Sequence, residues 1–412
     1  MTAKLIDRRV ALIVSLQVFL LAFKNCLISG IPYLFLINDS LNRVITVFVG
    51  ALYLYAFWIS RSRKLSLHCI LFWIFIFFSY IFTVLLFPQN IPFIQSSLLK
   101  TLTILFMTSI LLTKIKDYSW LEYYMTLFAY PIIIAGCIAG FFLTTIGHAT
   151  TATYEGDTYV MSLSYAVLIA VIWLLHEYFK RKRFLALLFA LVGVIIILLY
   201  GSRNPLLAIG TYVFIELIDS TEHNKNRASR SFYRLCLCVF AVLAVFYKQI
   251  IKVLLNLSSS LGFNSRTLQL FSADEIDLSN RDTIHDQLID LINANPLTGL
   301  GIQGDMAQMD EMAHSLYLSL LSTYGYIIGS AFIIYIIVIC ISALKRAKGI
   351  DHQLLVMYMC LVFPRSFTGG DMWGSDIFWW LLAFIFVVLS KRYNYSTNIY
   401  YLIKSSNLNG RE

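Results

Sequence analysis

Apolar stretches, each about as long as the thickness of a lipid bilayer, follow one another along almost the whole chain, separated by short polar breaks. A transmembrane helix needs roughly 20 apolar residues, and in lipid only helices and closed barrels satisfy all backbone hydrogen bonds. Only 13% of the 412 residues are charged, against roughly a quarter in soluble domains. The apolar stretches lie near residues 10–37, 43–60, 66–87, 95–113, 121–146, 159–178, 184–200, 203–218, 235–251, 314–343, 352–366 and 376–390. The sequence therefore predicts an all-α integral membrane protein with about twelve transmembrane helices.

The order of polar and apolar segments predicts four parts. One of these parts is the polar segment 251–313, and a loop that is this long between two membrane helices commonly carries function. The parts are 1–250 with helices one to nine, a large external loop over 251–313, 314–390 with helices ten to twelve, and a tail over 391–412.

The first apolar stretch is longer than a bilayer requires. It is interrupted by Lys24-Asn25 and by Pro32, and proline breaks or kinks a helix. We expect it to form either one kinked span or two pieces.

Basic residues alternate between the two sides of this predicted bundle. Most of the 32 Lys and Arg fall in every second polar break, starting with the N-terminal segment. Cytoplasmic loops of membrane proteins carry such an excess, so both termini are predicted to be cytoplasmic and 251–313 to lie outside. The net charge of +9 then reflects topology, and nucleic-acid binding is not expected, because no basic face with interleaved aromatic residues is present.

The external segment contains one predicted amphipathic helix, over Asn280–Asn293. Asn280 is a suitable N-cap, and Ile284 and Leu288 recur at helical spacing. A tight, glycine-containing turn follows over 295–301. We expect this helix to lie against the membrane surface or to cap the mouth of the bundle.

Three arginines on the predicted outer side are candidates for binding an anion, because a charge at membrane depth marks a site unless it is paired or hydrated. Arg203 precedes Pro205 at a predicted helix start, where backbone N–H groups also favour anions; alternatively it anchors the helix at the interface. Arg281 opens the amphipathic helix and could equally be a solvated surface residue. Arg365 could instead form a structural salt bridge with Asp371 or Asp376.

His314 is the candidate general base, because it lies where the external segment re-enters the membrane and imidazole titrates near neutral pH. A histidine at a helix start can also be a cap or a core residue, and His285 is the second candidate. The sequence has no nucleotide-binding loop and no ligand spacing for a metal, so neither a cofactor nor a metal is expected.

These features occur in a recognisable order: Ser202-Arg203 between two helices, then Arg281, the Asn295–Gly301 turn, and His314 leading into a helix with Gly325. In this order they resemble the O-antigen polymerase and O-antigen ligase superfamily. The resemblance covers roughly residues 200–330, and Ser315 stands where members often have Asn.

The resemblance implies a metal-independent, inverting glycosyltransferase of the bacterial inner membrane, whose donor is an oligosaccharide on undecaprenyl pyrophosphate. It implies that Arg203 and Arg281 hold the pyrophosphate, with Arg365 as a further candidate, and that His314 deprotonates the acceptor. A separate chain-length regulator and the membrane lipids would be partners.

Three functions remain open from the sequence. A polymerase transfers the glycan to another lipid-linked repeat unit, and the aromatic-rich segment 372–380 is more typical of polymerases. A ligase transfers it to the lipid A core. A lipid-linked oligosaccharide flippase would place charged residues inside its spans, where this chain has few.

Overall fold

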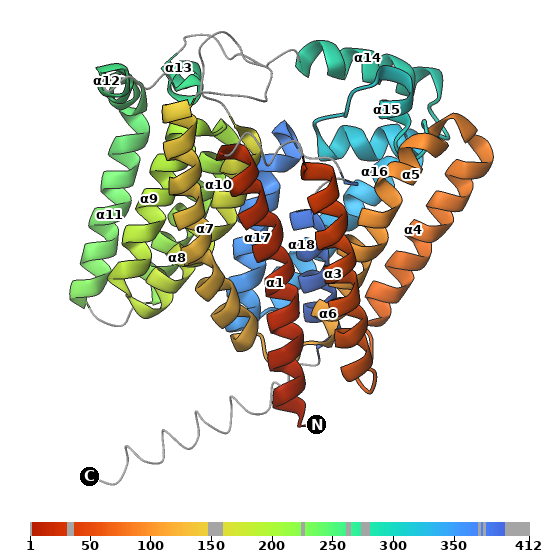
Figure 1. The fold of residues 1–412 in the computed structure, drawn as a ribbon, viewed down its shortest axis with the longest axis horizontal. Coiled ribbons are helices and arrows are strands. Elements are labelled where there is room, and N and C mark those ends of the chain that lie inside the picture. Colours follow the sequence, from red (N-terminus) through yellow and green to blue (C-terminus); the bar gives the residue numbers. More distant parts are fainter. Residues whose placement is uncertain are drawn as a thin grey trace.

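The computed structural model describes residues 2–30, 37–146, 160–223, 227–260, 265–272, 281–369, 372–373 and 376–391. Every regular element in these ranges is helical (Figure 1). The first elements are α1 (Ala3–Gly30), α3 (Asn38–Ile59), α4 (Leu67–Leu86), η1 (Pro88–Asn90), α5 (Ile91–Lys100), η2 (Thr101–Phe106), α6 (Met107–Lys114), α7 (Ser119–Ile146), α8 (Met161–Arg181) and α9 (Phe184–Tyr200). They are followed by α10 (Arg203–His223), α11 (Arg227–Val245), α12 (Tyr247–Ser260), α13 (Arg266–Ser272), α14 (Arg281–Ala294), α15 (Gly304–Met309), α16 (Leu316–Arg346), α17 (Ile350–Thr368) and α18 (Asp376–Ser390).

The chain is a multi-pass α-helical membrane protein. Among the described residues, six helices are long and apolar enough to cross a bilayer, or seven if the bent pair Pro88–Leu98 and Thr101–Lys114 counts as one span. Large apolar side chains lie exposed along α3, α4, α9 and the second half of α16. A soluble monomer rarely exposes so much apolar surface, whereas lipid covers it without cost.

As far as Gly30, the first apolar stretch lies in one continuous helix, α1, which passes through Lys24 and Asn25 without a break. The Lys24 ammonium donates hydrogen bonds to the side-chain oxygens of Asn38 (3.4 Å) and Asn42 (2.5 Å) on α3. A charge satisfied in this way does not require the helix to unwind. Pro32 lies outside the described residues.

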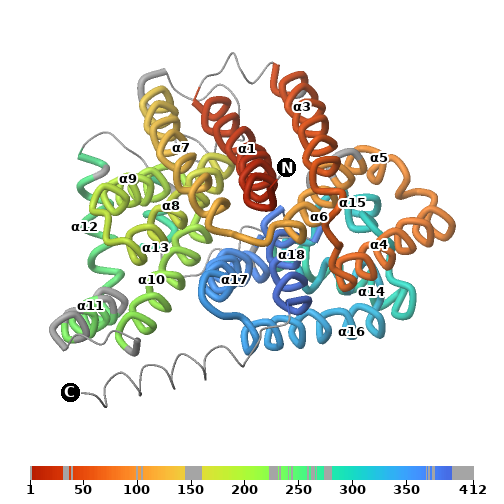
Figure 2. Tube along the Cα trace, turned by 90° about the horizontal axis from the view of Figure 1, so that it is seen from below, coloured from red at the N-terminus to blue at the C-terminus, as the bar shows by residue number. Residues whose placement is uncertain are grey.

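The short apolar helix α18 forms the centre of the bundle. Seen from below, α17 and α18 lie between α1 on one side and α16 on the other (Figure 2), and every residue from Ile377 to Val388 is buried. Trp379 stacks on Trp73 of α4 with ring centroids 4.7 Å apart, and its Nε1 donates to the Met372 carbonyl at 2.8 Å. Aromatic packing therefore fixes the helix whose first turn borders the cavity described below.

The two ends of the bundle differ in character. Helices α12 to α15 lie together at one end, and the chain begins at the other (Figure 1). At the starting end, Arg63 forms a buried ion pair with Asp7, and Asp7 also accepts a hydrogen bond from the Lys116 backbone N–H at 2.9 Å. Residues from the N-terminal segment and from two basic polar breaks thus meet at one end of the molecule, the end that the sequence predicts to be cytoplasmic.

The segment 251–313 is mostly helical where it is described, over parts of α12 and over α13, α14 and α15. The apolar stripe of α14, formed by Ile284, Leu288 and Ile292, is buried and packs toward α16. The stripe therefore faces α16; the position of α14 relative to the membrane surface stays a prediction. The expected N-cap Asn280 lies outside the described residues.

Candidate functional site: a cavity between α1, α8, α17 and α18

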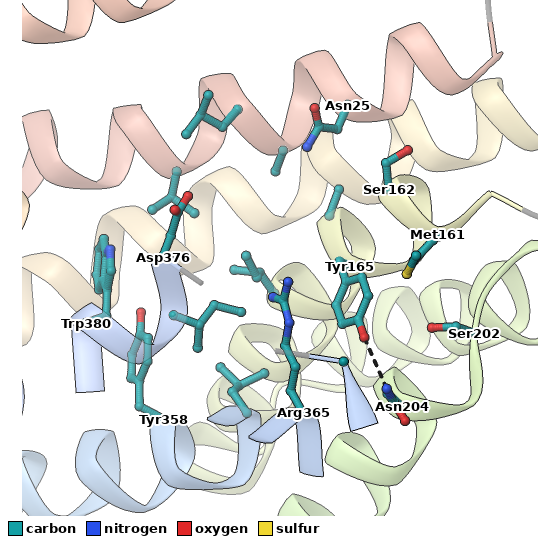
Figure 3. Close-up of a pocket in the computed structure, with 18 of the residues that line it drawn as sticks. Asn25, Met161, Ser162, Tyr165, Ser202, Asn204, Tyr358, Arg365, Asp376 and Trp380 are labelled. Atoms are coloured by element: carbon teal, nitrogen blue, oxygen red, sulfur yellow. Dashed lines mark hydrogen bonds between the residues drawn. The ribbon is translucent and has the colours of Figure 1, made fainter. Parts of the chain in front are cut away.

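A cavity of about 550 Å³ opens between α1, α8, α17 and α18. Its lining also includes the start of α10, the first residue of α14 and the turn before α16. Figure 3 shows side chains from α1, α8, α17, α18 and the start of α10 around this space. This volume is within the range of pockets that hold small organic ligands.

Three of the four charged candidates identified in the sequence line this one cavity: Arg281, His314 and Arg365. They come from three different elements, so only the fold brings them together. Arg203 is half-buried at the first residue of α10. Its neighbours Ser202 and Asn204 line the cavity, but Arg203 itself is not among the lining residues.

Arg365 is held in place by an aromatic ring. Its guanidinium carbon lies 4.4 Å from the centroid of the Tyr165 ring, a cation–π geometry that fixes the side chain without neutralising its charge. Its Nε is buried and donates no hydrogen bond within the described part of the chain. No described ion pair joins it to Asp376, and Asp371 lies outside the described residues, so the salt bridge to Asp376 considered from the sequence is absent here.

Tyr165 is in turn oriented by its neighbours. The Asn204 amide donates to its hydroxyl at 3.4 Å, and Gly369 lies directly beside this pair. A Cβ at Gly369 would stand 3.3 Å from Asn204 Nδ2 and 3.8 Å from the Tyr165 hydroxyl. The absence of a side chain at position 369 therefore keeps room for the Tyr165–Asn204 pair that supports Arg365; Figure 3 shows this pair.

His314 adopts an uncommon backbone conformation for a residue with a side chain, with φ at +49°. Left-handed conformations of non-glycine residues persist where surrounding contacts impose them. One such contact comes from the buried Asp305, whose Oδ2 accepts a hydrogen bond from the Ala313 N–H at 2.9 Å. His314 therefore leads from the anchored Ala313 to Ser315, which precedes the first residue of α16.

The turn over 295–301 leads into α15, the helix that contains Asp305. This turn is itself fixed by glycine contacts. The helix α16 is bent at Gly325, where φ is +73°, and the Leu300 N–H donates to the Ser322 carbonyl at 2.6 Å inside this bend. A Cβ on Gly299 would stand 2.5 Å from the Gly325 nitrogen, so only glycine permits this approach. The Asn90 amide donates to the carbonyls of Leu300 (2.8 Å) and Ile302 (3.1 Å) from the other side.

The charge of the cavity favours an anion. Two guanidinium groups and an imidazole line it, against one carboxylate, Asp376. His285, the second candidate base, is half-buried one turn into α14 and is not among the lining residues. Among the described residues, no group of three or more His, Cys, Asp or Glu side chains could hold a metal ion.

Several lining residues were not singled out from the sequence. Three of them belong to largely apolar helices: Tyr165, Asn204 and Tyr358. An isolated polar side chain in an apolar helix gives little sequence evidence of a functional site. For Asp376 a signal existed, because an acid at the start of an apolar span marks a site by default, but it was read only as a partner for Arg365. Asn25, from the interruption of the first apolar stretch, also lines the cavity.

Comparison with protein-family models, with curated proteins and with solved structures gives no match for this chain. The resemblance described above thus rests on the order of its own residues and motifs.

Proposed function

We propose that this protein is an O-antigen polymerase, a membrane glycosyltransferase that extends a lipid-linked oligosaccharide at the outer face of the bacterial inner membrane. The observation that carries the proposal is the convergence of Arg281, Arg365 and His314 on one cavity. Two permanent cations and a titratable base in one partly closed space suit a reaction in which an anion leaves and a hydroxyl attacks.

The donor would be an oligosaccharide on undecaprenyl pyrophosphate. As the bond between the anomeric carbon and the pyrophosphate oxygen breaks, negative charge develops on the leaving group. Arg281 and Arg365 would stabilise this charge, since guanidinium groups bind phosphate oxygens in pairs. His314 would take the proton of the acceptor hydroxyl while its oxygen forms the new bond from the opposite face of the sugar.

The topology belongs to the same proposal. About twelve spans would place both termini in the cytoplasm and 251–313 in the periplasm, so the cavity would open toward the lipid-linked substrates. The partly described loop helices α12 to α15 would lie on that side, where a chain-length regulator could reach them.

The test uses the purified protein in detergent with lipid-linked repeat units, and follows polymer length on gels. We expect Arg281→Ala, Arg365→Ala and His314→Ala each to lower the rate about 100-fold or more, as loss of a charge-stabilising group or a general base does. Matched controls are Arg43→Ala, an exposed arginine on α3, and His285→Ala. Arg203→Ala measures whether Arg203 reaches the substrate from beside the cavity. Wild-type rates in the three cavity variants would exclude the proposal.

A deletion strain distinguishes the polymerase from the alternatives. Loss of long chains with single repeats retained on lipopolysaccharide supports the polymerase. Complete loss of O-antigen from lipid A indicates a ligase instead. Repeat units trapped on the cytoplasmic side would indicate a flippase.

A further inference from the structure

The cavity has a second part with a different chemistry. Figure 3 shows Asp376, Trp380 and Tyr358 gathered at one end, on the far side of Arg365 from Ser202 and Asn204. Asp376 is the first residue of α18 and Trp380 lies one turn further along the same helix. This end therefore combines a carboxylate with two aromatic rings, whereas the other charged lining residues are basic.

The two rings form a rigid wall. Tyr358 and Trp380 are stacked, with centroids 5.6 Å apart and planes inclined by only 11°. Both side chains are buried, with 3% and 4% of their surface exposed, yet both line the cavity. Because neighbouring helices hold them, a ligand meets a preformed apolar surface at little entropic cost.

One amide group from α1, that of Gln17, also lines the cavity. Gln17 is buried, and the Tyr53 hydroxyl donates to its Oε1 at 2.8 Å, which holds the amide in one orientation. The same Tyr53 hydroxyl lies 2.7 Å from Thr108 Oγ1, so the amide is supported from α3 and the α6 region. Polar groups fixed in this way provide specificity in an otherwise apolar pocket.

This combination selects a class of ligand. A phosphate would be repelled by Asp376, and a cation would be repelled by the two arginines in the same cavity. A prenyl chain would leave the carboxylate and amides desolvated without hydrogen bonds. A neutral ring with hydroxyl groups at its rim and an apolar face satisfies both the polar groups and the aromatic wall.

We propose that Asp376, Trp380, Tyr358 and Gln17 form a binding site for a pyranose ring, the sugar attached directly to the lipid pyrophosphate. This inference rests on the proposed function, because Arg365 would hold the pyrophosphate between the two parts of the cavity. Asp376 and Gln17 bind the sugar hydroxyls, and Trp380 packs against its apolar face. These residues then select which first sugar the enzyme accepts.

The experiment compares two probes on the full-length protein in detergent: geranylgeranyl pyrophosphate, and the same lipid pyrophosphate carrying one N-acetylglucosamine. Binding is measured by isothermal titration calorimetry. We expect the wild type to bind the glycosylated lipid about tenfold more tightly, and Asp376→Asn and Trp380→Leu to abolish this preference while leaving affinity for the bare lipid within about twofold. Arg365→Gln weakens binding of both probes.

Matched controls are Asp286→Asn on the exposed face of α14 and Trp58→Leu, whose side chain is 60% exposed; both retain the preference. If Trp380→Leu does not elute as a single species in size-exclusion chromatography, Trp380→Phe replaces it. This variant keeps an aromatic face and should retain part of the preference. Equal wild-type affinities for the two probes, or equal losses for both in the Asp376→Asn variant, would overturn the sugar site while leaving the pyrophosphate site intact. Failure of the wild type to bind either probe would overturn the proposed function itself.

Discussion

Replacing Asp305 by Asn tests how the fold holds the candidate base. The two carboxylate oxygens of Asp305 accept hydrogen bonds from the backbone N–H groups of Met306 (3.0 Å) and Ala313 (2.9 Å). An amide offers one oxygen and one N–H₂ group, so one of these two bonds must be lost. A hydrogen bond to a charged group contributes about 1.5–3 kcal/mol.

The bond from Ala313 lies directly before His314, whose positive φ is itself unfavourable by about 1–3 kcal/mol. Without the anchor, the backbone relaxes and His314 leaves the cavity for most of the time. A loss of about 1.5–3 kcal/mol corresponds to a 10- to 150-fold lower kcat, at about 1.4 kcal/mol per factor of ten. The donor KM stays nearly unchanged, because the arginines are not disturbed.

The assay is steady-state polymerisation by purified Asp305→Asn protein, with Asp310→Asn as the matched control, since Asp310 is exposed at the C-cap of the same short helix. The pH dependence of kcat should keep its shape, because the base is displaced and not chemically altered. A wild-type kcat would refute the reasoning. So would a rise in KM with kcat unchanged, or a loss of activity explained by a lower melting temperature.

Three further predictions concern stability and the cavity. Gly325→Ala should lower the melting temperature markedly, because a Cβ would stand 2.6 Å from the Pro296 carbonyl oxygen at a φ of +73°; Gly349→Ala, at a φ of +56° with nothing within 4 Å, isolates the cost of the backbone angle alone. Asp7→Ala should lower the free energy of unfolding by about 3–5 kcal/mol, because it leaves the buried Arg63 without its ion-pair partner. Chemical denaturation monitored by circular dichroism measures this free energy, and a change below about 1 kcal/mol would contradict the prediction. Tyr165→Leu should raise the donor KM several-fold by removing the ring beneath the cavity arginine, whereas Tyr165→Phe keeps the ring and should have a smaller effect; equal effects in kinetic assays would argue against the cation–π contact.

The membrane character of the chain follows from its composition and from the length of its apolar stretches. The structure agrees, because within lipid the backbone hydrogen bonds of such stretches must be satisfied internally, as they are in helices. The number of spans does not follow so directly. α18 has 15 residues and α9 has 17, which is short for a bilayer. α18 is surrounded by other helices, so its length is set by packing and not by lipid.

The behaviour of interruptions in the apolar pattern depends on distant partners. The interruptions at Lys24-Asn25 and Pro32 predict a kinked or divided first span, but two asparagines on α3 satisfy the charge of Lys24 and the helix continues as far as Gly30. Gly325 lies in an apolar stretch and nevertheless bends α16, because the turn over 295–301 donates hydrogen bonds into the break. Neither outcome is encoded within the segment concerned.

The residue types needed for an anion site with a base were evident in the sequence, because charged groups in or beside apolar segments are costly and therefore few. Their grouping was not. Arg281, His314 and Arg365 are far apart in the chain, and only helix packing decided that they border one cavity and that Arg203 is not among its lining residues. Local sequence determines which residues can tolerate a membrane and which cannot; the direction in which each side chain points depends on contacts between helices, and those exist only in the folded bundle.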